Sequence, residues 1–116
     1  MRGRLARVVA GVTASAALLS GGPALAADAP AEIALTIDQH RFQPEEIRVK
    51  AGAPFVLVIT NKDATPEEFE SKELRIEKVI PAGKTLRLRM PSLKKGTYGF
   101  VGEFHEATAK GRILAE

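Results

Sequence analysis

The chain has no cysteine among its 116 residues. This absence excludes disulfides, zinc sites built on thiolates and any metal centre that needs a sulfur anion. Histidine is almost as scarce, with only His40 and His105. The sequence also lacks a recognisable serine-histidine-aspartate set and a phosphate-binding glycine loop, so hydrolase chemistry has little support.

An excess of charge of one sign is missing from most of the chain. The full sequence has 17 Lys and Arg against 14 Asp and Glu. Three of the arginines and none of the acids lie in residues 1–26, so residues 27–116 carry 14 charges of each sign. The high isoelectric point therefore belongs to the N-terminal segment, and a nucleic-acid partner has no compositional support.

The first 26 residues have the pattern of a secretory signal peptide. Basic residues precede the short apolar run 8–19, and Ala24-Leu25-Ala26 matches the small-x-small cleavage motif. The run is short for a membrane anchor, which is the alternative. We expect cleavage before Ala27, one mature domain over residues 27–116, and no membrane insertion after cleavage.

The rest of the chain favours β-strands. Apolar residues alternate with polar ones in several short segments, and "PFVLVITN" is a continuous apolar run typical of a buried strand. We expect an all-β antiparallel sandwich of about seven strands. Residues 61–69 are expected to form a polar loop, with at most a turn or two of helix within 66–73. Met90 shares the parity of Leu86 and Leu88 and is expected in the core.

Three stretches resemble the cupredoxins, the family of Greek-key sandwiches that includes the blue-copper proteins. They are "RFQPEEIRVKAGAPFVLVITN", "NKDATPEEF" and "GTYGFVGEFHEATAKGRI". Their order and spacing match the early strands, the first metal loop and the last metal loop of that family. The resemblance covers nearly all of residues 32–116 and implies a cupredoxin-like Greek-key β-sandwich.

Two of these stretches are similar to a narrower group within the cupredoxins. "EFESKELRIEKVIPAGKT" and "GEFHEATAKG" resemble small exported proteins of bacterial ferrous-iron uptake systems. The resemblance implies a periplasmic location. It also implies a periplasmic iron-binding protein or an inner-membrane iron permease as partner. Binding of Fe(II), or its oxidation as by a ferroxidase, would be the activity.

The resemblance also shows where the ligands of a blue-copper site are missing. Glu67 stands at the position of the first histidine, Gly102 at that of the cysteine, and Ala109 near that of the methionine. Only His105 is kept. A blue-copper centre needs the thiolate, so this type of site is not expected.

The two metal loops of the family instead carry carboxylates here. We expect Glu67, Glu103 and His105 to be the inner ligands of a copper or iron ion. We expect a fourth ligand, or an outer partner of the ligands, among Glu68, Glu70 and Glu106. Oxygen ligands with one imidazole suit iron or Cu(II) better than Cu(I).

Simpler interpretations stay open. His105 could be an ordinary loop histidine bonded to a backbone carbonyl, and the glutamates could be a solvated acidic loop. His40 lies in the early turn, away from the matched loops, and is expected on the surface. Phe69 and Phe104 are expected to form an apolar wall beside the site. Alternative functions are a copper-binding or copper-delivery protein and a metal-free module that docks a partner.

Overall fold

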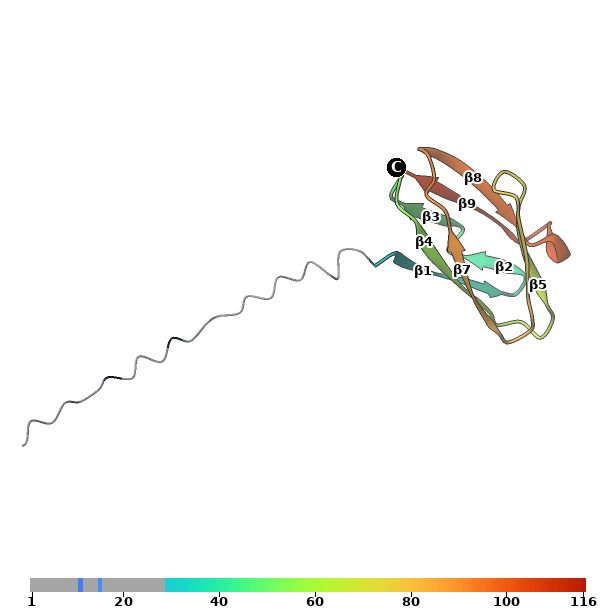
Figure 1. Cartoon of the computed structure of the whole chain (residues 1–116). Helices are drawn as coiled ribbons and strands as arrows, with labels where there is room; N and C mark the ends of the chain where they lie inside the picture. The colour runs from blue at the N-terminus through green and yellow to red at the C-terminus, as the bar shows by residue number, and fades with distance from the viewer. Residues whose placement is uncertain (1–10, 12–14, 16–28) are drawn as a thin grey trace, which may run out of the picture.

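The computed structural model describes residues 11, 15 and 29–116. The predicted signal peptide and its cleavage site therefore lie almost entirely outside the described residues. Within the described part of the chain, no helix is long and apolar enough to cross a membrane. The domain itself is a sandwich of two β-sheets (Figure 1).

Nine strands and one short 3₁₀ helix make up the described domain. Their bounds are β1 Ala31–Asp38, β2 Arg41–Gln43, β3 Glu46–Val49, β4 Phe55–Asn61, β5 Glu67–Ser71, β6 Ile76–Ile80, β7 Thr85–Met90, β8 Gly96–Val101, η2 Glu103–His105 and β9 Lys110–Ala115. One sheet has the order β2-β1-β4-β7 and the other β3-β9-β8-β5-β6. The all-β sandwich predicted from the sequence is confirmed.

The predicted antiparallel pairing of the strands has two exceptions. β1 pairs in parallel with β4, with Ala31 opposite Phe55, and β3 pairs in parallel with β9, with Glu46 opposite Arg112. The remaining strand pairs are antiparallel. Apolar alternation reveals where a strand lies and which face is buried, but it carries no information on the direction of its neighbour.

The two strands that the sequence did not predict both lead into the same end of the sandwich. β2 lies in the stretch expected to be a turn, and β5 begins inside the expected polar loop 61–69 and occupies the segment 66–73 thought capable of a helical turn. β5 lacks the usual alternation because Glu67 and Glu68 are both buried at its start. Buried carboxylates therefore stand where a buried strand usually has apolar residues, and the apolar pattern that would predict the strand is missing.

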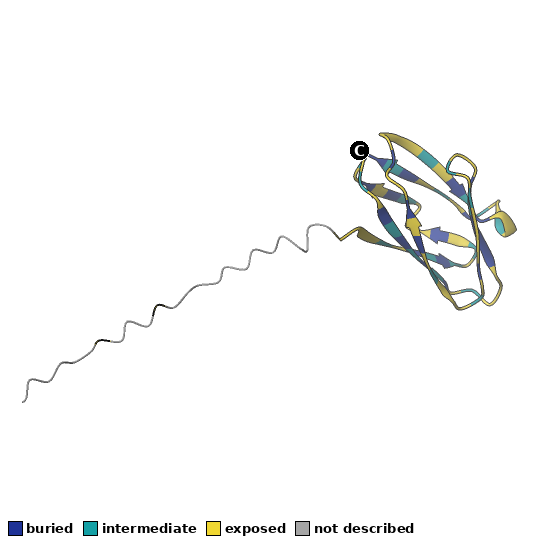
Figure 2. Ribbon diagram, viewed as in Figure 1, coloured by how far each residue is buried: buried dark blue, intermediate teal, exposed yellow. Residues whose placement is uncertain are grey.

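The core fills the space between the sheets (Figure 2). Met90 is 2% exposed, as its parity predicted. Phe42, Phe69 and Phe100 form an aromatic group, with ring centroids 4.9 Å apart for Phe42–Phe100 and for Phe69–Phe100. A fully buried phenylalanine contributes about 1.5–3 kcal/mol to folding. These three rings anchor β2, β5 and β8, the strands next to the segments that carry the polar residues described below.

Candidate metal centre

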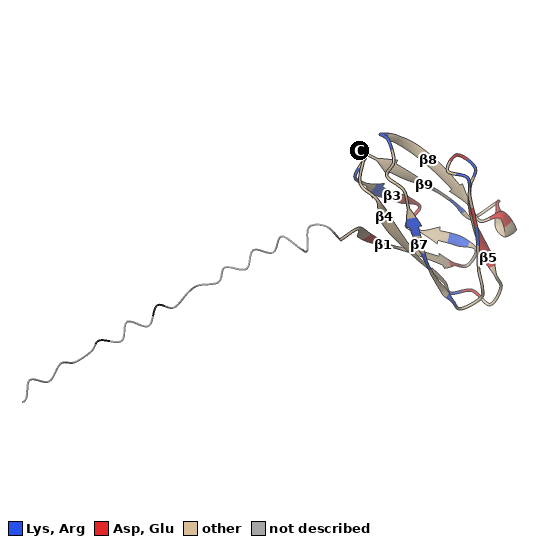
Figure 3. Ribbon diagram, in the orientation of Figure 1, with Lys and Arg blue, Asp and Glu red and all other residues tan. Residues whose placement is uncertain are grey.

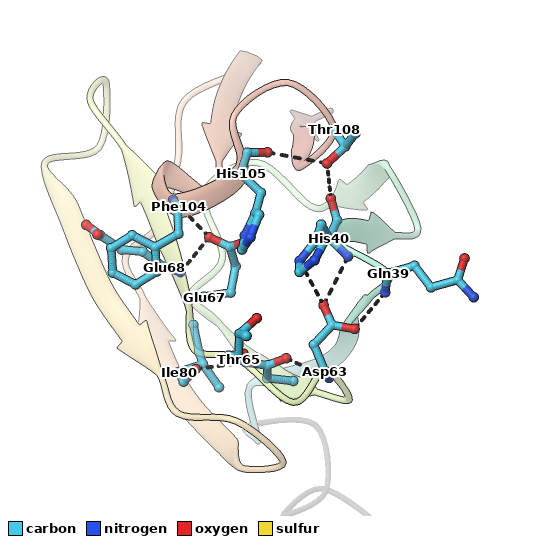
Figure 4. Close-up of polar contacts among 11 residues, drawn as sticks. Gln39, His40, Asp63, Thr65, Glu67, Glu68, Ile80, Phe104, His105 and Thr108 are labelled. Atoms are coloured by element: carbon cyan, nitrogen blue, oxygen red, sulfur yellow. Dashed lines mark hydrogen bonds and ion pairs between the residues drawn. The ribbon is translucent and has the colours of Figure 1, made fainter.

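Two histidines and a buried glutamate meet at one end of the sandwich (Figure 4). His40 comes from the β1–β2 turn, Glu67 from the start of β5, and His105 from the end of η2. One donor atom from each lies within 4.8 Å of the others. Segments from the beginning, middle and end of the domain therefore supply the three side chains.

The β1–β2 turn presents His40 through an uncommon backbone conformation. Gln39 and His40 are the two residues between the strands, with φ of 53° and 57°. A two-residue hairpin with both φ values positive is a tight turn that usually contains Asn or Gly. Non-glycine residues adopt it at a cost, and such residues are common at functional sites.

Asp63 stabilises this turn from the loop between β4 and β5. Its carboxylate accepts hydrogen bonds from the backbone N–H groups of Gln39 at 2.7 Å and His40 at 3.0 Å. Burial alone would raise the pKa of Asp63, but these backbone hydrogen bonds and the nearby histidines outweigh it, so the pKa is lowered. Asp63 is therefore held as an anion against the His40 turn.

Thr108 holds the same turn from the other side. Its hydroxyl donates a hydrogen bond to the backbone carbonyl of His40 at 2.5 Å. The Thr108 N–H also bonds the carbonyl of His105 at 3.1 Å. One threonine thus links the segment carrying His105 to the turn carrying His40, and the position of each imidazole depends on the other.

Glu67 is the most enclosed of the three candidate ligands, with 1% of its surface exposed. Its Oε1 accepts hydrogen bonds from the backbone N–H groups of Glu68 at 2.9 Å and Phe104 at 3.1 Å. Its Oε2 lies 2.5 Å from Nδ1 of His105. One carboxylate oxygen is therefore fixed by the backbone while the other faces the imidazole.

The imidazole of His105 lies between Glu67 and His40. The rings of His105 and His40 are stacked, with centroids 3.6 Å apart and planes inclined by 17°. Nδ1 of His40 is buried without a hydrogen-bond partner and lies 3.5 Å from the Asp63 carboxylate. An unpartnered buried polar atom indicates a missing ligand or water.

The chemical types of the three donor atoms suit a metal ion, but the distances between these atoms differ from those around a bound ion. Metal bonds to histidine nitrogen and carboxylate oxygen are about 2.0–2.2 Å long, so two donors on one ion are at most about 4.2 Å apart. The three donors lie within 4.8 Å of one another, but Glu67 Oε2 and His105 Nδ1 are only 2.5 Å apart, so these two atoms would separate slightly if both bound one ion. Two imidazoles and a carboxylate form a set that holds Fe(II) in several protein sites, and nitrogen and oxygen donors also suit Cu(II).

Gly102 explains why a blue-copper centre does not fit. A Cβ added there would lie 2.7 Å from Cδ of Glu67 and 2.7 Å from Cβ of Ala109. The φ of Gly102 is −90°, which any residue adopts, so glycine is required for space alone. The Glu67 carboxylate fills the place that a thiolate would need.

The predicted ligands separate into two groups. Glu67 and His105 come together as expected, but Glu103 lies with Glu68 and Glu70, whose carboxylates form a second cluster. The structure thus places Glu103 with Glu68 and Glu70, apart from the group that contains His105. Glu106 is exposed and belongs to neither cluster.

The expected apolar wall is also only partly present. Phe69 is fully buried in the core, whereas the side chain of Phe104 is 49% exposed. Phe104 contributes its backbone N–H to Glu67 rather than an enclosing ring.

His40 is the residue that the sequence interpretation missed. Its side chain keeps 43% exposure, but it stacks on His105 rather than lying apart from the metal loops. The signal that could have revealed it is the two-residue gap between strands, because histidine is one of the few residues enriched at positive φ. That hairpin also ends at the same edge of the sandwich as the metal loops.

The sequence and the fold were compared with known proteins. An uncharacterized protein of Rickettsia prowazekii (strain Madrid E) is 37% identical over 95 residues, which cover 82% of this chain and 76% of that protein. Among solved structures, auracyanin A, a blue copper protein of Chloroflexus aurantiacus, matches with a TM-score of 0.65. The match has 13% identity and covers 76% of this chain and all of auracyanin A.

A second solved structure with a TM-score of 0.65 is the metal-binding domain of the Cu(I)-exporting P-type ATPase CopA of Streptococcus pneumoniae D39, determined with Cu(I). It is 16% identical, and the match covers 73% of this chain and 84% of that domain. At these identities the two structures establish the fold alone. The model of the cupredoxin-like domain family matches residues 9–115, and the chain therefore belongs to this family.

Proposed function

We propose that the chain is an exported metal-binding protein that holds an iron or copper ion between His40, Glu67 and His105. The observation that carries this proposal is the convergence of two stacked imidazoles on a buried carboxylate. Burying a carboxylate is costly unless it is paired. A proton or a cation between Glu67 Oε2 and His105 Nδ1 satisfies both atoms.

The preferred role is participation in ferrous-iron uptake in the periplasm. The resemblance of "EFESKELRIEKVIPAGKT" and "GEFHEATAKG" to proteins of such systems supports it, as does a donor set suited to Fe(II). In this role iron is cargo, bound at the imidazole–carboxylate site. It is then passed to a periplasmic iron-binding protein or an inner-membrane permease.

Calorimetric titration of metal-free protein tests the site directly. Fe(II) under anaerobic conditions and Cu(II) are each titrated into the wild type and into His40→Ala, Glu67→Gln and His105→Ala. Glu106→Gln is the matched control, since Glu106 is exposed and outside both clusters. We expect saturable binding of one ion that is lost in the three site variants and kept in the control. Failure of both ions to bind the wild type would reject the metal site and favour a partner-docking module.

Copper handling is the second candidate function. It is supported by the solved neighbours, a blue copper protein and a domain determined with Cu(I). Affinity alone does not separate the two functions, because a nitrogen and oxygen site binds Cu(II) more tightly than Fe(II) by the general order of stability. The metal content of protein recovered from the native periplasm is the better test. A second test is the growth of a His105→Ala strain under iron limitation and under copper excess.

A further inference from the structure

A second group of carboxylates lies on the other face of β5 from Glu67. Neighbouring residues of a strand point to opposite faces of the sheet, so Glu68 and Glu70 share the outer face while Glu67 points inward. Glu103, at the start of η2, reaches this outer face. One carboxylate oxygen from each of the three residues lies within 4.8 Å of the others. Figure 3 shows acidic residues on β5 and on the adjacent loop.

The side chain of Glu68 gives an independent indication that this cluster binds a ligand. Its side chain is 3% exposed, and Oε1 is buried without any hydrogen-bond partner. A buried carboxylate left unpartnered costs more than an ordinary unmade hydrogen bond.

The strands around Glu68 add acidic groups. Glu77 of β6 stands directly opposite Glu70 of β5, an arrangement of like charges that destabilises a sheet. Lys72, which follows β5, is the one basic side chain that lowers the pKa of Glu70. Within residues 29–116, no ion pair involves the carboxylates of Glu68, Glu70 or Glu103. The field of Lys72 therefore offsets the repulsion only in part, and no protein cation pairs directly with the three carboxylates.

We propose that Glu68, Glu70 and Glu103 form a second cation site, selective for a hard ion that takes only oxygen ligands. This site is separate from the His40–Glu67–His105 site, and the proposal does not depend on the function given above.

Size favours an ion with long bonds to oxygen. Ca(II) binds oxygen at about 2.3–2.6 Å, so two ligands on one Ca(II) ion are up to about 5 Å apart. The three carboxylate oxygens lie within 4.8 Å of one another, inside this range. Mg(II) binds at about 2.0–2.1 Å in a nearly ideal octahedron and usually keeps several waters with one or two carboxylates, so three converging carboxylates suit it less well. Water ligands have access, since Glu70 also lines a surface hollow of about 370 Å³ with Lys72 and Glu106.

The test is a titration of the full metal-free chain with Ca(II) and with Mn(II), followed by heat release and by melting temperature. The variants are Glu68→Gln with Glu70→Gln, Glu103→Gln alone, His105→Ala and, as matched control, Glu45→Gln, which is exposed and outside both clusters and this hollow. We expect one ion to bind the wild type, with a raised melting temperature because the ligand binds the native state. The affinity falls at least tenfold in the two cluster variants and is unchanged in His105→Ala and Glu45→Gln.

Two results would overturn the proposal. One is the absence of saturable Ca(II) or Mn(II) binding to the wild type. The other is unchanged binding in Glu103→Gln, a substitution of an exposed residue that leaves the fold intact even if the double variant fails to fold. Loss of Ca(II) or Mn(II) binding in His105→Ala would place the ion at the histidine site instead. His105→Ala should lose Fe(II) and Cu(II) binding and keep Ca(II) and Mn(II) binding. Each of the two proposed sites can therefore fail without the other.

Discussion

The carboxylate of Glu67 occupies the space in which a side chain at position 102 would lie. A Cβ built on Gly102 would approach Cδ of Glu67 to 2.7 Å and Oε1 to 2.8 Å. Real Cβ atoms do not come this close to neighbouring heavy atoms, so the two positions are coupled. Glutamate at 67 requires glycine at 102, and the fold cannot hold both Glu67 and a thiolate at the site.

This coupling predicts how a blue-copper site could be rebuilt. Gly102→Cys alone should melt at a lower temperature and give no intense visible absorption with Cu(II), because Glu67 blocks the sulfur. Glu67→His with Gly102→Cys and Ala109→Gly removes both atoms that lie 2.7 Å from the new Cβ, supplies two histidines and one cysteine with His105, and should give the strong absorption of a copper–thiolate bond. Absorption spectra of both variants with Cu(II) test this. Equal absorption in the single variant would show that Glu67 does not compete for the space.

Asp63 is predicted to position His40 without binding the metal itself. Asp63→Asn removes the negative charge that accepts the two backbone N–H groups of the hairpin. Loss of an outer partner of a metal ligand lowers affinity about 10–100-fold, and we expect a decrease of this size for Cu(II) and Fe(II). Asp38→Asn, at the end of β1 next to the same turn, is the matched control. A normal affinity in Asp63→Asn would indicate that the turn holds His40 unaided.

Asn61 is predicted to be the main structural support of the loop that carries Asp63. Its fully buried side chain donates to the carbonyls of Thr65 and Ile80 and accepts from the Asp63 N–H. Each buried group left unpaired costs about 1–3 kcal/mol, so Asn61→Ala should lower the free energy of unfolding by about 3 kcal/mol or more. Denaturant unfolding measures this.

A neighbouring residue provides the comparison for Asn61. Thr60 has an exposed hydroxyl that pairs with Thr85 at 2.9 Å. Thr60→Val should change the free energy of unfolding by about 1 kcal/mol or less. Similar losses in Asn61→Ala and Thr60→Val would contradict the special role of Asn61.

Glu68 is predicted to make the metal-free protein less stable as pH rises. The folded protein keeps the Glu68 proton up to a pKa of about 8, whereas an ordinary glutamic acid loses it near 4.5. Between these values the folded state binds more protons than the unfolded chain, so stability falls with rising pH through this window. Glu68→Gln should remove this decrease and melt above the wild type at pH 9, with a small difference at pH 4.

The measurement for Glu68 is the melting temperature from pH 4 to pH 9 in the presence of a chelator. Glu106→Gln, with its exposed side chain, should follow the wild type across this range. Parallel curves for Glu68→Gln and the wild type would contradict a raised Glu68 pKa.

The sandwich and two of the three residues of the candidate site could be predicted from the sequence. Alternation identified most strands, and the resemblance to the cupredoxin metal loops located Glu67 and His105. The grouping of Glu103 could not be predicted, because it depends on which face of β5 each glutamate takes, and β5 has no apolar alternation to indicate it. His40 could not be found by motif because its place depends on how the first hairpin lies against the last loop.

The stacking of His40 on His105 joins the first hairpin of the domain to its last loop. An ion bound to both rings would act as a reversible cross-link between segments far apart in the chain, a role that disulfides fill in many small exported domains. Such a link exists only after the two ends of the domain have packed together, because neither segment alone holds the donors. Metal loading would thus report that folding is complete, and removal of the ion would loosen both ends of the cysteine-free domain at once.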